Sequence, residues 1–83
     1  MKLTKFMKTE YPYYVSARVY SGQLQKVFKT AKYKTYDDCY LALKRWLFRI
    51  KSNEGQYVIL QYTSSYECKI LTIITDNVET KLI

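Results

Sequence analysis

Residues 35–51 carry the pattern of one amphipathic helix, set between segments that alternate like strands. Thr35 is suited to cap the helix N-terminus, with Asp38 three residues later in an approximate capping box and Asp37 complementing the helix dipole. The expected core stripe recurs at helical spacing: Tyr36, Tyr40, Leu43, Leu47 and Ile50, flanked by Cys39 and Trp46. One helix among strands predicts an α+β fold, with the helix packed on one face of a single antiparallel sheet.

A basic hairpin is predicted over residues 11–34, ahead of the helix. Its strands are expected at 13–20 and 24–32, joined at Ser21-Gly22, where glycine accepts a positive φ. Tyr13, Val15, Ala17 and Val19 then share one side of the first strand, and Tyr14, Ser16, Arg18 and Tyr20 share the other.

A second hairpin is predicted over residues 56–75, after Gly55, which we expect to end the helix. Its strands, 56–63 and 66–75, are rich in β-branched and aromatic residues. Residues 76–83 hold a candidate fifth strand at the sheet edge, 78–82. The predicted order is β-β-α-β-β, with that last strand left open.

The length of 83 residues allows one domain, 1–83, with residues 1–10 as an N-terminal segment. No run has the length of a membrane span or the apolar core of a signal peptide. We therefore expect a soluble, cytoplasmic protein with no membrane partner.

Residue types needed for most catalysis are missing from the chain. It has no histidine, two glycines and two cysteines, and Cys39 and Cys68 lack the spacing of metal ligands. Asp37 and Asp38 are placed for helix capping and not for acid–base chemistry. We expect no enzyme activity, no metal and no cofactor; the simplest account leaves both thiols free, with a Cys39–Cys68 disulfide as the alternative.

Positive charge is concentrated in the first part of the chain. Residues 1–34 carry eight Lys/Arg against one acid, whereas residues 52–83 carry two against four, within a net charge of +7. Such asymmetry is typical of a protein that meets a polyanion with one end or face. A solvated basic surface without a ligand would give the same excess.

The basic hairpin is the first candidate site, because lysines beside aromatic rings suit nucleic-acid binding. The residues expected to contact nucleic acid are Arg18, Lys26, Lys29, Lys32 and Lys34, with Tyr14, Tyr20 and Tyr33 as rings for stacking. The lysines divide between two faces of the predicted strand unless a bulge, or a bend near Ala31, realigns them. Strand propensity alone is the alternative explanation for the tyrosines.

A strip on the outer side of the helix is the second candidate site, for a protein interface. Leu41 and Phe48 nearly coincide in helical angle, with Lys44 and Arg45 beside them. If the segment around Leu3, Phe6 and Met7 covers the strip, it belongs to the core. Otherwise the strip favours a homodimer or docking on another protein.

Residues 17–47, ARVYSGQLQKVFKTAKYKTYDDCYLALKRWL, resemble the AP2-like, arm-binding N-terminal domain of phage and transposon integrases. The resemblance implies a sheet face laid on DNA, involving Arg18, Lys26, Lys29 and Lys32. The chain departs from that family in having two predicted strands before the helix and strands after it in place of a recombinase core. In size and composition it is also similar to small phage accessory and anti-defence proteins, including anti-CRISPR proteins, which would act in the host cytoplasm.

The sequence thus predicts a small non-enzymatic protein of phage or mobile-element type that contacts nucleic acid through the basic hairpin. The alternative is a protein–protein inhibitor of a host defence or nucleic-acid-processing complex, acting through the helix strip or an exposed sheet edge.

Overall fold

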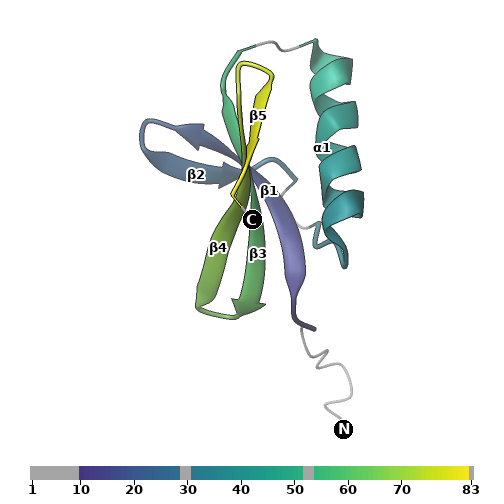
Figure 1. The fold of residues 1–83 in the computed structure, drawn as a ribbon, viewed down its shortest axis with the longest axis vertical. Helices are drawn as coiled ribbons and strands as arrows, with labels where there is room; N and C mark the ends of the chain where they lie inside the picture. Colours follow the sequence, from purple (N-terminus) through teal and green to yellow (C-terminus); the bar gives the residue numbers. More distant parts are fainter. Residues whose placement is uncertain (1–9, 29–30, 52–53, 83) are drawn as a thin grey trace, which may run out of the picture.

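One antiparallel sheet and one helix make up the part of the chain that the computed structural model describes, residues 10–28, 31–51 and 54–82 (Figure 1). The elements are β1 (Tyr13–Tyr20), β2 (Gln23–Lys26), α1 (Tyr36–Ile50), β3 (Gln56–Ser64), β4 (Glu67–Thr75) and β5 (Val78–Lys81). The predicted α+β class is confirmed. The predicted order is completed by the fifth strand, which the sequence had left open.

The strands lie in the order β2-β1-β3-β4-β5, so β1 joins the two hairpins by pairing with β3. Tight two-residue turns link β1 to β2 and β4 to β5. Ser21 and Gly22 have φ values of 52° and 77°, and Asp76 and Asn77 have 50° and 71°, the left-handed pair that suits the twist of two-residue hairpins. The pairing of β3 with β4 shifts register between Ile59 and Leu60 of β3. A bulge of this kind bends the strand that carries it.

One predicted strand end and one predicted helix cap are wrong. The second strand was expected over 24–32, but β2 ends at Lys26; a separate isolated bridge joins Tyr33 to Tyr14 of β1. The helix lies within the predicted range of 35–51, but its left-handed C-cap is Lys51, with φ 54°, and not Gly55.

The N-terminus of α1 is capped as predicted. The Thr35 side chain accepts a hydrogen bond from the backbone N–H of Asp38 at 3.1 Å. This bond satisfies one of the amide groups that the first helical turn leaves without a backbone partner.

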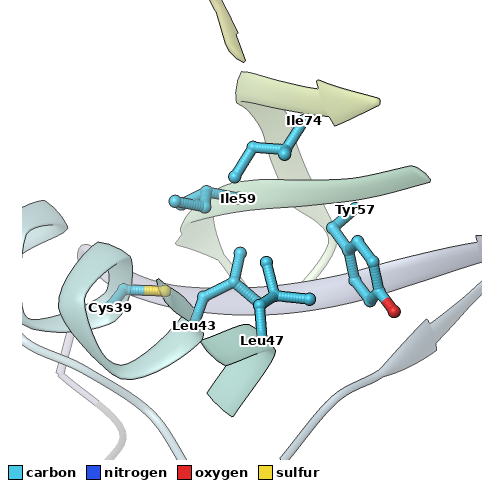
Figure 2. Packing of buried hydrophobic residues seen from close by; sticks show 6 residues of the cluster. All are labelled: Cys39, Leu43, Leu47, Tyr57, Ile59 and Ile74. Atoms are coloured by element: carbon cyan, nitrogen blue, oxygen red, sulfur yellow. The ribbon is translucent and has the colours of Figure 1, made fainter. Parts of the chain in front are cut away.

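The main core lies between α1 and one face of the sheet (Figure 2). Helix residues Cys39, Leu43 and Leu47 point toward the strands, where they meet Tyr57, Ile59 and Ile74. Tyr36 and Tyr40 are half-buried beside this cluster. Ile50, expected in the stripe, is 45% exposed, because it lies at the last turn of the helix.

A second cluster lies on the opposite face of the sheet, which we call the helix-free face. Val15 and Ala17 of β1 pack there with Val58 and Leu60 of β3, and all four are buried. These residues alternate along their strands with those that face α1. Larger half-buried neighbours pack against them: Tyr13, Val19, Tyr62 and Ile73.

Cys39 and Cys68 are both free thiols. Cys39 is buried under α1, whereas Cys68 is exposed and pairs in register with Tyr62 on the helix-free face. The disulfide alternative is therefore excluded by their placement on the two sides of the sheet.

Two leucines of α1 allow a matched test of this packing. Leu43 is fully buried and Leu41 is 47% exposed. Leu43→Ala should lower the free energy of unfolding by about 2–5 kcal/mol, because it leaves a cavity beneath the helix. Leu41→Ala should lower it by less than about 1 kcal/mol. Urea unfolding followed by circular dichroism measures both, and equal losses would contradict the orientation of the helix.

Candidate functional site

Three aromatic rings gather on the helix-free face, at the end of the sheet that carries the β3–β4 turn. Tyr13 of β1 stacks on Tyr62 of β3, with ring centroids 5.0 Å apart and planes 9° from parallel. Tyr11 lies against Tyr13 at 5.5 Å, tilted by 33°. The Nζ of Lys32 lies 4.9 Å from the Tyr13 centroid, within the range of a cation–π contact. These four residues are called the tyrosine patch below.

The phenol groups of Tyr13 and Tyr62 are uncharged at neutral pH. Burial is the main cause that raises the pKa of Tyr13 and of Tyr62 above 10.0, and the neighbouring Cys68 adds to both. Both rings therefore offer flat apolar surface and a neutral hydroxyl, and they bring no negative charge to the patch.

Lys26 and Lys32 lie on the helix-free side of the β2 edge. Lys26 pairs with Ala17, a residue of the helix-free face, and cross-strand partners share a face. Beyond Lys26, the Val27 N–H still donates to Ser16 O, and Tyr33 exchanges backbone hydrogen bonds with Tyr14 further along β1. Lys34 is exposed, next to Tyr33. Lys29 lies outside the described residues.

Two of the tyrosines predicted for stacking lie on the helix side. Tyr14 and Tyr33 pack against the cluster under α1, and the Tyr14 hydroxyl accepts a hydrogen bond from Gln61 Nε2 at 3.0 Å. The Tyr33 ring meets the edge of Phe28 at 6.4 Å. Packing within the core thus accounts for both rings.

Arg18 and Tyr20 form a separate group at the other end of β1. The Arg18 guanidinium lies 5.6 Å from the Tyr20 ring and 6.0 Å from the Tyr57 ring. Tyr57 belongs to the cluster under α1, so Arg18 projects on the helix side of the sheet. The structure therefore separates Arg18 and Tyr20 from Lys26 and Lys32 by face, and it also places Lys32, beside Tyr13, at the other end of β1.

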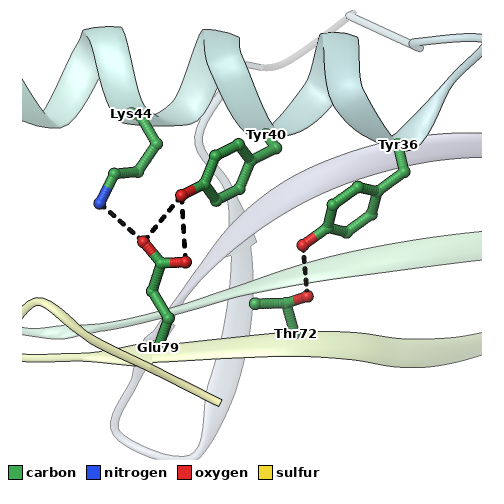
Figure 3. Close-up of polar contacts among 5 residues, drawn as sticks. All are labelled: Tyr36, Tyr40, Lys44, Thr72 and Glu79. Carbon is green, nitrogen blue, oxygen red and sulfur yellow. Dashed lines mark hydrogen bonds and ion pairs between the residues drawn. The ribbon is translucent and has the colours of Figure 1, made fainter. Parts of the chain in front are cut away.

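The predicted helix strip is exposed, but one member is engaged elsewhere. Phe48 is 86% exposed, and Leu41 and Arg45 are also exposed. Lys44 instead turns toward β5, where its Nζ lies 2.9 Å from Glu79 Oε2 (Figure 3). The strip open to a partner is Leu41, Arg45 and Phe48.

Glu79 ties β5 to α1. The Tyr40 hydroxyl donates to both of its carboxylate oxygens, at 3.0 and 2.9 Å, beside the Lys44 contact. A neighbouring pair, Tyr36 Oη and Thr72 Oγ1 at 2.6 Å, attaches the first helical turn to β4. The hydrogen bond from Lys44 is the main cause that lowers the pKa of Glu79 below 4.5.

The other chemical groups considered in the sequence have structural roles. Burial raises the pKa of the Cys39 thiol to about 12, so the thiol stays protonated among the core side chains. Asp37 and Asp38 lie in the first turn of α1, as expected for capping. The described residues hold no group of three His, Cys, Asp or Glu side chains that could bind a metal ion. The helix α1, the one helix among the described residues, is too short and too polar to cross a membrane.

The tyrosine patch contains three rings that the sequence analysis did not select: Tyr11, Tyr13 and Tyr62. Tyr13 was placed on the same side of the strand as Val15, opposite the side of Tyr14, Arg18 and Tyr20, which were chosen as candidates for nucleic-acid contact. The sequence did carry a signal for this patch. One helix covers only one face of a sheet, yet both faces of β1 and β3 carry large apolar residues, so some of them must lie on the uncovered face.

Comparison with protein-family models, curated proteins and solved structures found no match to this chain. The fold and the site define a small α+β protein whose sheet is covered by a helix on one face and carries aromatic and basic residues on the other.

The Glu79 contacts predict an acid-sensitive part of the stability. Because the folded-state pKa of Glu79 is lowered, its contribution is present above the unfolded-state pKa and is lost as pH falls through the folded-state value. Glu79→Gln should therefore cost up to about 1 kcal/mol at pH 7, and the difference from wild type should close below about pH 4.

Thermal and urea unfolding across this pH range measure the effect. Glu67→Gln, which removes an exposed carboxylate at the start of β4, is the matched control and should cost less than Glu79→Gln at pH 7. If the loss of stability in Glu79→Gln stayed constant with pH, the packing of this side chain, and not its charge, would hold β5 to the helix.

Proposed function

We propose that this protein is a non-enzymatic module that binds nucleic acid through the helix-free face of its sheet. The observation that carries the proposal is the Lys32 ammonium group 4.9 Å from the Tyr13 ring, which is stacked on Tyr62. A cation suits a phosphate and an aromatic ring suits a base, so the patch offers both kinds of contact in one place.

The charges favour an approach from the β2 side of the sheet. Lys26, Lys32 and Lys34 are exposed along that side, in a protein with a net charge of +7. Acidic side chains flank the other approaches, with Glu10 before Tyr11 and Glu67 at the start of β4. Phosphates are therefore expected over the β2 edge, with the rings beside them.

The geometry supports part of the contact set that the integrase-domain resemblance implies. Lys26 and Lys32 lie on one side, whereas Arg18 projects on the other, so the proposal keeps the two lysines and omits Arg18. A contact from Lys29 and an origin in phages or mobile elements stay predictions.

A salt titration tests the proposal. Fluorescence anisotropy with labelled DNA and RNA should show log K falling linearly with log salt. The triple variant Lys26→Ala, Lys32→Ala, Lys34→Ala should bind more weakly to every sequence. Its slope should decrease by roughly 2 to 3, since each neutralised phosphate adds about 0.7 for single strands and 0.9 for duplex.

Lys81→Ala is the matched control, because Lys81 lies on β5 at the opposite edge of the sheet. It should keep the wild-type slope within about 0.5, less than the contribution of one phosphate. Absence of binding to any nucleic acid at low salt, or an unchanged slope in the triple variant, would exclude the proposed function.

The helix strip favours a second candidate function, an inhibitor that docks on a protein of a defence or nucleic-acid-processing complex. Its support is the 86% exposure of Phe48, with Leu41 and Arg45 on the same side of α1. A large ring left in water beside a second apolar residue is a common feature of docking surfaces.

Replacing the ring separates the two functions. Phe48→Asp should abolish stoichiometric capture of a protein partner, while leaving the salt slope for nucleic acid unchanged. Val78→Ser, which removes a 67% exposed apolar side chain from β5, is the control and should capture the partner normally. If Phe48→Asp instead converts a dimer to a monomer in light scattering, the strip is a homodimer interface and the inhibitor function loses its support.

A further inference from the structure

We infer that the polynucleotide bound at the tyrosine patch is single-stranded, with unpaired bases stacking on its rings. The inference rests on the proposed function and adds to it the class of ligand that the site selects. It depends on how the rings are held, on where the lysines lie beside them, and on what the sheet offers to a duplex.

The rings are held in place before any ligand arrives. Tyr13 and Tyr62 are cross-strand partners in the β1–β3 ladder, and their stacking fixes both side chains. Both are half-buried against the second cluster. Rings that are already ordered lose little conformational entropy when a base stacks on them.

Ring surface is exposed at the Tyr11 end of this row, and Tyr62 at the other end is partly exposed. Tyr11 is 40% exposed and lies outside the Tyr13–Tyr62 stack. On the other side, the residue across from Tyr62 is Cys68, whose side chain is small and exposed. A base can therefore approach the row at Tyr11 or beside Tyr62, provided that its flat face is free.

In a duplex the flat faces of the bases are covered by their neighbours in the stack. A duplex is recognised through its groove edges, which a helix or a two-stranded ribbon can enter. The patch lies on the surface of a sheet, and the β1–β2 hairpin turn, Ser21-Gly22, projects at the opposite end of β1 (Figure 1). The rings are thus placed for unpaired bases.

The lysines complete a path for one backbone. Lys32 lies directly beside the Tyr13 ring, and Lys26 lies further along the same edge of the sheet and on the same face. A strand that follows this edge can place phosphates on the lysines while its bases turn toward the rings. Grooves that bind single strands without sequence preference combine a basic track with aromatic rings in this way.

The test compares single-stranded and hairpin-duplex oligonucleotides with equal numbers of phosphates, at one salt concentration, by anisotropy. Wild type should bind the single strands more tightly. Tyr11→Ala and Tyr62→Leu should each weaken single-strand binding by roughly 5- to 100-fold, the range of one lost stacking contact, with the salt slope unchanged. Tyr62→Leu keeps apolar volume in the half-buried position, and Tyr11 is exposed, so both variants should fold.

Tyr20→Ala is the matched control, because Tyr20 is 55% exposed but lies at the other end of β1 on the helix side. It should bind like wild type. A single strand with abasic sites keeps its phosphates and loses its bases, and it should bind wild type at least as weakly as the intact strand binds Tyr11→Ala.

The outcomes separate this inference from the proposed function. The inference is overturned if duplex binds as tightly as single strands, or if Tyr11→Ala and Tyr62→Leu leave single-strand binding unchanged. In either case, a salt slope that depends on the lysines would still support nucleic-acid binding. Absence of binding to any oligonucleotide overturns both.

Discussion

The packing of one helix on one face of a sheet is the constraint on which the rest of this structure depends. Leu43 and Leu47 of α1 close the core over Ile59 of β3, and the polar contacts of Tyr36 and Tyr40 hold the helix in register with β4 and β5. Because the chain places its only described helix there, the other face must bury its apolar side chains by contacts within the sheet. The arrangement of aromatic and basic groups on that face follows from this division.

The elements that sequence reasoning predicted correctly depend on nearby residues. The cap at Thr35 and the turn at Ser21-Gly22 require residues no more than a few positions apart, so their patterns are visible along the chain. The alternation of Val15 and Ala17 with Ser16 likewise predicts the two faces of β1.

The features that were missed depend on distant partners. The alternation along β1 does not say which of its faces the helix covers. That depends on Tyr57, Ile59 and Ile74 of later strands, which form the surface on which the helix packs. The end of β2 was also unpredictable from its own pattern. Phe28 leaves the strand path to meet Trp46 of α1 at 6.3 Å, a contact between segments on either side of the helix N-terminus.

The pairing of β1 with β3 has a consequence for the order in which the protein forms. The N-terminal hairpin is made of adjacent segments, but its inner strand is the neighbour of a strand that follows the helix. The first hairpin and the helix can therefore be synthesised well before the surface that they must cover exists. Non-local pairing of this kind slows folding, because a long loop must close before its contacts stabilise it. A ribosome-bound chain that ends at the helix would expose the Tyr13 ring before Tyr62 of β3 exists to stack on it.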